Sequence, residues 1–381
     1  MFYNLTNKYK ALIAIFFLVL LTSLWANNIY ILVLFSFLTY LIMPLNKWWD
    51  NTSILLFCFS VLYSLILLLT NQVLSYFILC AYAIAPVAFY RFGRFLMTIY
   101  PDEESRQKIL LYILLSFLVS LFILTFKDIL AVGLVNLNRA MTGDIASDDA
   151  LSATYYGLLS AVGIPCIASI FAREQKLSIR LGFIFISLLS LLVVIHLVNR
   201  TGLVIAGGVI IISFLYISQK NPNKKLRYIF LVLILGLVIL KSGVLNEEIF
   251  AAYQAREANS SFDTEEFGGR LQLWTNAVQN LLVYPFGWHQ ESYAHNFLLD
   301  TARACGLLPF ILLLISTFSW IKSVIKLCTR NYTPFILLVI SINFSMFLSV
   351  MVEPVLDCSI LYFAIFVMIW GITQSLSKIG N

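Results

Sequence analysis

Two arginines stand at places in this sequence where their side chains could bind an anion. Arg200 lies between two long apolar runs, so its guanidinium is either an anchor at a membrane boundary or an anion ligand facing a polar cavity. Arg270 follows Gly268-Gly269 at the expected start of a helix, where glycine allows close backbone approach and the helix N-terminus adds partial positive charge. That position favours phosphate, and the alternative is a solvated charge on an exposed loop.

A histidine near the start of a later apolar run could handle a proton. His295 is followed by Asn296, and Asp300 and Arg303 come one and two helical turns later, on roughly the face of Asn296. Near neutral pH an imidazole can accept or donate a proton, or bind phosphate when it is charged. A lone histidine at a helix start is often structural, so both interpretations stay open.

Other candidate residues have weaker patterns. Arg139 and Arg256 lie in polar stretches, His196 is inside an apolar run, and His289 has no polar partners at helical spacing. No glycine-rich nucleotide fingerprint or nucleophile elbow is present, and the three histidines are too dispersed for a zinc site. We expect neither a metal nor an organic cofactor. The six cysteines occur singly in or beside apolar runs and are interpreted as small hydrophobic residues.

The elements that position these residues are predicted to be membrane-spanning helices. The chain is 61% hydrophobic and 12% charged, with a mean hydropathy of +0.91, which excludes a soluble protein of this length. Apolar windows recur at the length that crosses about 30 Å of hydrocarbon, and we count about twelve. The predicted spans are approximately 11–27, 29–46, 53–70, 72–90, 108–126, 151–172, 180–198, 201–218, 227–243, 303–320, 332–352 and 355–376.

The distribution of basic residues predicts the orientation. Lys and Arg concentrate in alternate connections and near both ends, as cytoplasmic segments do. We therefore expect a multi-pass protein of the bacterial inner membrane with both termini in the cytoplasm. The net charge of +6 describes this asymmetry and does not indicate nucleic-acid binding.

Two outer loops are longer than the other connections of the predicted single membrane domain, 1–381. The smaller periplasmic loop is 127–150 and the larger is 244–302. Within the larger loop, apolar residues from Gly269 to Val283 follow helical spacing and include Trp274, which predicts an amphipathic helix at the outer interface, in contact with membrane lipid. The fold class is therefore an all-α transmembrane bundle with short helices in one large loop.

The order of these motifs resembles the O-antigen ligase and O-antigen polymerase superfamily. The likeness covers roughly residues 180 to 320 and is carried by motifs that are individually weak. They are Asn199-Arg200-Thr201, then Gly269-Arg270 with Trp274, then Tyr284-Pro285-Phe286-Gly287, then Ala294-His295-Asn296 and Gly306.

The resemblance implies a GT-C-like, metal-independent membrane glycosyltransferase whose donor is an undecaprenyl-pyrophosphate-linked glycan. Arg200 and Arg270 would hold the donor pyrophosphate, and His295 would lie beside the acceptor or the phosphate. The residues expected to bind substrate are Arg139, Asn296, Asp300, Arg303 and Trp274. The expected protein partners are a flippase and a chain-length regulator of surface polysaccharide.

Members of this superfamily either join lipid-linked repeats or transfer the finished glycan to lipid A-core. The short stretch between Gly287 and His295 favours an O-antigen polymerase, and an O-antigen ligase is the alternative. A flippase or transporter of lipid-linked glycans is a hypothesis of another class. The near absence of charged residues within the spans speaks against it.

Overall fold

The computed structural model describes most of the 381-residue chain. The described residues are 6–25, 28–43, 49–70, 72, 75–138, 140–142, 150–172, 174–220, 249, 251–254, 270–288 and 293–378. They fall into two compact units, each of which is described by itself. Unit 1 comprises Met1–Ser120, Arg270–Thr329 and Met346–Asn381, and unit 2 comprises Leu121–Gly269 and Arg330–Ser345.

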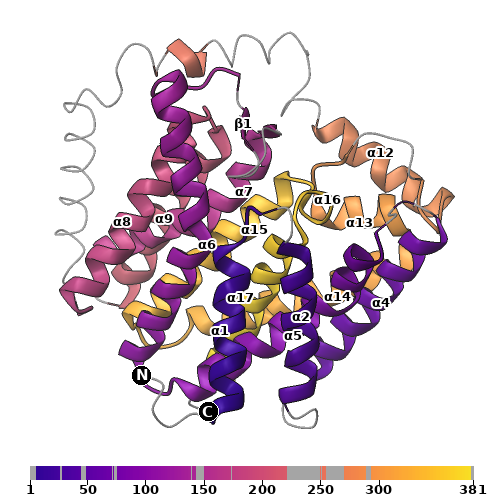
Figure 1. Cartoon of the computed structure of the whole chain (residues 1–381), viewed down its shortest axis with the longest axis horizontal. Coiled ribbons are helices and arrows are strands. Elements are labelled where there is room, and N and C mark those ends of the chain that lie inside the picture. Colours follow the sequence, from indigo (N-terminus) through magenta and orange to yellow (C-terminus); the bar gives the residue numbers. More distant parts are fainter. Residues whose placement is uncertain are drawn as a thin grey trace. The chain divides into compact units, whose positions relative to one another are not determined.

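Unit 1 is a bundle of helices (Figure 1). Two further helices, α6 (Glu103–Val132) and α15 (Pro334–Val352), belong to both units. The helices of unit 1 alone are α1 (Asn7–Leu21), α2 (Asn28–Ile42), α4 (Asn51–Leu69), α5 (Tyr76–Ile99), α12 (Arg270–Val283), α13 (Phe297–Cys305), α14 (Leu307–Cys328), α16 (Val355–Cys358) and α17 (Ile360–Lys378).

The core of unit 1 forms around α17, which is buried along most of its length and packs against α5 and α14. Small residues bring α17 and α5 into backbone contact. A Cβ atom at Gly93 would collide with the carbonyl oxygen of Met368, and one at Gly371 would collide with that of Tyr90. Close approach at small residues is how transmembrane helices gain packing energy, because lipid offers them no hydrophobic driving force.

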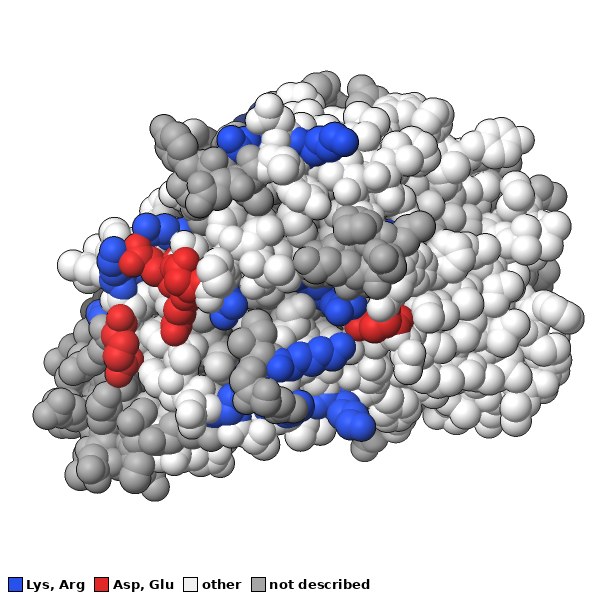
Figure 2. Space-filling model, turned by 90° about the horizontal axis from the view of Figure 1, so that it is seen from below, with Lys and Arg blue, Asp and Glu red and all other residues white. Residues whose placement is uncertain are grey.

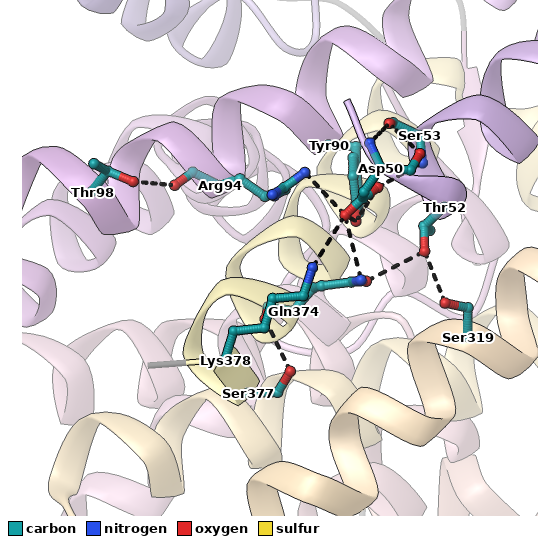
Figure 3. Close-up of polar contacts among 10 residues, drawn as sticks. All are labelled: Asp50, Thr52, Ser53, Tyr90, Arg94, Thr98, Ser319, Gln374, Ser377 and Lys378. Carbon is teal, nitrogen blue, oxygen red and sulfur yellow. Dashed lines mark hydrogen bonds and ion pairs between the residues drawn. The ribbon is translucent and has the colours of Figure 1, made fainter. Parts of the chain in front are cut away.

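A polar cluster around Asp50 fixes one end of this bundle (Figure 3). Asp50 caps α4 by accepting a hydrogen bond from the backbone of Ser53, and its carboxylate lies 2.9 Å from the Arg94 guanidinium of α5. Lys378, the last residue of α17, approaches the same carboxylate to 3.5 Å. Tyr90 also donates to it. The start of α4, the second half of α5 and the end of α17 therefore meet at one end of unit 1.

The opposite end of unit 1 holds the start of α17 together with α13 and α16. The Gln72 side chain, just past the end of α4, donates to the carbonyl oxygen of Ala304 at 3.0 Å. The 19 residues of α17 separate the two ends by about 28 Å, close to the thickness of a bilayer's hydrocarbon core. Figure 2 shows the face seen from below in the view of Figure 1. Lys and Arg side chains gather on this face.

Unit 2 contains α7 (Ala153–Gly163), the 3-10 helix η1 (Ile164–Ile170), α8 (Leu177–His196) and α9 (Arg200–Lys220), with parts of α6 and α15. It also contains an antiparallel pair of short strands, β1 (Ala140–Thr142) and β2 (Ala150–Ser152), in register with Met141 opposite Leu151. The sequence did not predict these strands, which flank part of the smaller predicted loop.

Nine helices in the described part of the chain are long and apolar enough to cross a membrane, which supports a multi-pass α-helical membrane protein. Of the other predicted spans, 11–27 and 29–46 correspond to the 15-residue helices α1 and α2. The span predicted at 227–243 lies outside the described residues. The number twelve, the single domain and the periplasmic side of the loops stay predictions.

Several predicted boundaries were wrong; for example, the span predicted at 72–90 corresponds to α5, which continues to Ile99. The helix that contains the span predicted at 108–126 continues to Val132, and Asp128 near its end lies 2.7 Å from both Asn136 and His196. The span expected to begin at 303 begins at Leu307 instead. Gly306 has φ +80° and separates α13 from α14, so Arg303 lies in the short preceding helix.

Candidate functional site

His295 lies in a strained backbone conformation two residues before α13, the helix that contacts both α12 and α16 (Figure 1). Its φ is +52°, in the left-handed region that residues with a Cβ rarely adopt. Such strain costs on the order of 1–3 kcal/mol, so it persists only where neighbouring contacts impose it. Strained residues cluster at functional sites, which makes the contacts that fix His295 informative.

The carboxylate of Asp300 supplies the first of these contacts. One oxygen accepts a hydrogen bond from the backbone N–H of Ala294 at 2.7 Å, and the other accepts from Asn296 at 2.9 Å. The two bonds grip the chain on either side of His295. The Asp300 side chain is fully buried, and burial raises its pKa, although the two N–H groups, Arg303 and His295 act in the opposite direction.

Asn296 joins the loop to two helices. Its side-chain oxygen accepts from the backbone N–H groups of Leu298 and Leu299, which makes it the N-cap of α13. Its amide nitrogen donates to the carbonyl oxygen of Met351, near the end of α15, at 3.4 Å. Asparagine is among the preferred capping residues because its short side chain satisfies free N–H groups of the first turn. Asn296 and Asp300 therefore belong to one local hydrogen-bond network, and their role in binding substrate stays a prediction.

Trp274 connects α12 to the same loop. The helix predicted from Gly269 to Val283 is confirmed as Arg270–Val283, and the indole N–H of Trp274 donates to the carbonyl oxygen of Ala294 at 2.8 Å. Arg270 begins this helix one turn before Trp274, a rise of about 6 Å along the axis. The hydrogen bond thus joins the first turns of α12 to the residue just before His295.

Arg303 is engaged within the protein. Its Nε lies 3.6 Å from Asp300, and its guanidinium carbon lies 4.7 Å from the centre of the Tyr293 ring. The Arg303 side chain is only 9% exposed, so these contacts stabilise the loop. Tyr293 in turn lies edge-on to the His295 ring, with 6.5 Å between centroids.

Glu353 is a site residue that the sequence analysis missed. One carboxylate oxygen lies 3.7 Å from Nδ1 of His295, and Nδ1 is buried without a hydrogen bond to any described residue. Glu353 stands between α15 and α16, followed by Pro354. A single acid at the end of a long apolar run is costly in a membrane protein, and that signal could have identified it.

The motif Tyr284-Pro285-Phe286-Gly287 packs against Gly306. The backbone N–H of Leu307 donates to the carbonyl oxygen of Pro285 at 2.9 Å, and a Cβ at position 306 would collide with that oxygen. Only glycine fits there, because the site demands both a positive φ and a close backbone approach. Two parts of the pattern that suggested the family resemblance are therefore in direct contact.

Unit 2 holds the second predicted arginine. Arg200 is the first residue of α9, and the preceding Asn199 accepts a hydrogen bond from the N–H of Gly202 at 3.1 Å. Val198 has φ +50°, so this corner is strained as well. Arg200 and His295 belong to different units, and their prediction as one site stays a prediction.

His196 has closer partners than the sequence suggested. Its Nε2 lies 2.7 Å from Asp128, and its Nδ1 lies 2.9 Å from the carbonyl oxygen of Leu134. Asn136 donates to the same Asp128 oxygen at 2.7 Å and also to the carbonyl oxygen of Ala140. The ring of His196 is fully buried, so this cluster joins the residues after α6 to the end of α8.

Several predicted residues cannot be placed in the site. Arg139, Arg256 and His289 lie outside the described residues, and of Arg270 only the backbone is described. Among the side chains that the structure does describe, no group of three or more His, Cys, Asp or Glu could hold a metal ion.

Comparison of the sequence with models of known protein families gives no match, and comparison with curated proteins gives none. The resemblance to the O-antigen ligase and polymerase superfamily therefore rests on the motifs and their order.

Proposed function

We propose that this protein is a membrane glycosyltransferase of the bacterial envelope. Its donor is an undecaprenyl-pyrophosphate-linked glycan, and within that class it acts as an O-antigen polymerase. The acceptor is then a second lipid-linked repeat. In the ligase alternative the acceptor is lipid A-core.

One observation carries the proposal. The hydrogen bond from Trp274 to Ala294 joins α12, one turn after Arg270, to the strained loop of His295. A helix N-terminus with an arginine suits a diphosphate, because N–H groups and a guanidinium both donate to phosphate oxygens. An imidazole at the same place suits a hydroxyl that must lose a proton.

The proposed reaction uses these groups in complementary roles. The acceptor hydroxyl oxygen attacks the anomeric carbon of the donor sugar, and the bond from that carbon to the pyrophosphate oxygen breaks. The leaving group takes the electron pair, and Arg270 with the α12 N-terminus stabilises its growing negative charge. His295 takes the hydroxyl proton. Fixed guanidinium groups can stabilise such charge in a water-poor site without a metal. The family resemblance implies a pyrophosphate-binding role for Arg200 as well.

The distribution of charge supports an outer location for this chemistry. Arg94 and Lys378 both lie beside Asp50 at one end of unit 1, and an excess of basic residues is typical of the cytoplasmic side (Figure 3). The His295 loop lies at the other end of α17. If that end faces the cytoplasm, the start of α1 and the end of α17 do so too, and the His295 loop faces the periplasm.

The proposal is tested by the surface polysaccharide of cells that carry substituted proteins. Arg200→Ala, Arg270→Ala and His295→Ala are expected to abolish long chains while the protein remains in the membrane at its usual level. Lys326→Ala, an exposed basic residue in α14, is the matched control and should keep wild-type chains. Wild-type chain profiles in all three site variants would contradict the proposal.

The deletion strain distinguishes the two activities within the class. Lipopolysaccharide that stops at core plus one repeat indicates a lost polymerase. Bare core indicates a lost ligase. Lipid-linked repeats that accumulate on the cytoplasmic leaflet would instead indicate a flippase, because both transferases act after the repeats have crossed the membrane.

A further inference from the structure

We infer that Glu353 is the positioning residue for His295: its carboxylate binds the Nδ1 side of the imidazole and leaves Nε2 to take the proton of the acceptor hydroxyl. This inference rests on the proposed function and extends it to a residue outside the region of the family resemblance. It specifies both the partner of the imidazole and which ring nitrogen faces the substrate.

The orientation of the His295 ring fits this role. Nδ1 of His295 is buried and lies 3.7 Å from Oε2 of Glu353, whereas the His295 side chain as a whole is 34% exposed. The buried nitrogen therefore faces the carboxylate. A shift of under about 1 Å would complete a hydrogen bond. Hydrogen bonds at catalytic groups are often long before substrate binds and shorten in the complex.

The backbone on both sides keeps this orientation in place. Asp300 binds the N–H groups next to His295, and Trp274 binds the carbonyl oxygen of Ala294. On the other partner, the backbone oxygen of Glu353 accepts from the N–H of Val355 at 3.0 Å. Hydrogen bonds from α12, α13 and α16 thus hold the backbone at His295 and at Glu353.

Glu353 and Asp300 have different roles although both are acids near the ring. Both oxygens of Asp300 already accept backbone hydrogen bonds, and its side chain has no exposed surface. Asp300 therefore shapes the loop. The Glu353 side chain is 10% exposed and lies beside a ring nitrogen. The other titratable or charged groups near the pair are Tyr293, Arg303 and, on the Glu353 side, Tyr362 of α17.

The chemical consequence follows from the two nitrogens of imidazole. With its proton on Nδ1 directed at Glu353, neutral His295 presents a lone pair on Nε2. When Nε2 takes the hydroxyl proton, the ring becomes an imidazolium, and the neighbouring carboxylate stabilises its charge without taking the proton itself. The hydroxyl oxygen forms the new glycosidic bond, and the pyrophosphate leaves with the electrons of the bond that breaks. The imidazolium later releases its proton to water.

The test uses the full-length protein reconstituted in lipid nanodiscs with an undecaprenyl-pyrophosphate-linked repeat, and measures kcat and KM from pH 5 to 9. Glu353→Gln is expected to lower kcat roughly 10- to 100-fold with little change in the KM for the donor, since general-base catalysis contributes about 10²–10⁴-fold in total. The acidic limb of the kcat profile should move to lower pH, because the variant has lost the negative charge that favours the imidazolium. Glu174→Gln, an amide replacement at a carboxylate that accepts from Tyr332 away from the site, is the matched control and should behave as wild type.

A double variant separates this inference from the proposed function. His295→Ala with Glu353→Gln should be no slower than His295→Ala alone, because Glu353 acts through the ring. An active His295→Ala protein would overturn the proposed function itself. An inactive His295→Ala protein beside a Glu353→Gln protein of wild-type kcat would overturn only the role of Glu353, as would losses that multiply in the double variant.

If Glu353→Gln does not reach the membrane, Glu353→Asp answers the same question. It keeps the charge but withdraws it by one methylene, so kcat should fall by a smaller factor and the acidic limb should stay in place. A displaced limb or an unchanged kcat in that variant would overturn the inference.

Discussion

Among the described residues, two histidines lie beside carboxylates, one in each unit, and they differ in what surrounds them. In unit 2, both ring nitrogens of His196 have acceptors within 2.9 Å and the side chain has no exposed surface. In unit 1, His295 is partly exposed, its backbone is strained, and Glu353 lies 3.7 Å from its buried nitrogen. A buried ring whose two nitrogens both have hydrogen-bond partners stabilises a fold. An accessible ring on a strained backbone can contact a substrate.

The comparison also shows why proximity to an acid does not identify a site by itself. Leu134 can only accept through its carbonyl oxygen, so Nδ1 of His196 must carry a proton. Nε2 faces Asp128 at 2.7 Å, so the pair shares a further proton between them. No ring nitrogen remains for a substrate. The closer contact, between His196 and Asp128, is structural, and the longer contact, between His295 and Glu353, is the candidate for catalysis.

The largest effect on turnover is expected when the His295 ring is removed. His295→Ala should lower turnover by about 10²–10⁴-fold, the usual contribution of a general base, and leave the melting temperature of the protein nearly unchanged. Turnover of the reconstituted protein and its thermal unfolding in detergent check this. A large loss of stability with normal turnover per folded molecule would show that His295 is a structural residue.

The next effect concerns the loop that presents His295. Asp300→Ala removes both hydrogen bonds beside the strained residue, so the backbone should relax and misplace the ring. Misplacement by about 1 Å can cost about 100-fold in rate. Asp300→Asn, which retains one acceptor oxygen, should fall between wild type and alanine. Equal turnover in all three proteins would mean that the strain has no role.

In unit 2 the expected effect is on stability. His196→Ala leaves Asp128 and the Leu134 carbonyl without the ring, which should cost about 1–3 kcal/mol of the free energy of unfolding. The fraction that still folds should lose far less turnover than His295→Ala does. Unfolding in denaturant, followed by activity of the folded fraction, tests both points. A stable but inactive His196→Ala protein would reverse the assignment of the two histidines.

The smallest effect is expected at Trp274. Trp274→Phe retains an aromatic ring but loses the donor to Ala294, a single neutral hydrogen bond of about 1 kcal/mol. Such a loss should lower turnover about fivefold if it is felt in the transition state. Thr275→Ala on the exposed side of α12 is the matched control. Identical rates in all three proteins would show that α12 is not coupled to the loop.

Sequence patterns predicted what depends on neighbours along the chain. The spans, the α12 helix and the grouping of Asn296 with Asp300 follow from apolar periodicity, capping and helical spacing. They failed where partners come from far away. Glu353 lies 58 positions from His295 in the sequence, and Asp128 lies 68 positions from His196. No local sequence pattern predicts contacts between residues so far apart.

Backbone conformation was the second source of error. Gly306 reads as one residue within an apolar run, yet its positive φ divides two helices and shifts the start of the predicted span. The short strands β1 and β2 pair with each other, and neither has enough residues to show alternation of apolar and polar side chains.

The most direct test measures release of undecaprenyl pyrophosphate together with glycan lengthening by the purified protein. The proposal predicts that wild-type protein releases one lipid pyrophosphate for each repeat added, and that His295→Ala and Arg270→Ala release almost none although both proteins fold. Lengthening that continues in both variants, or lipid release without lengthening in the wild type, would contradict it.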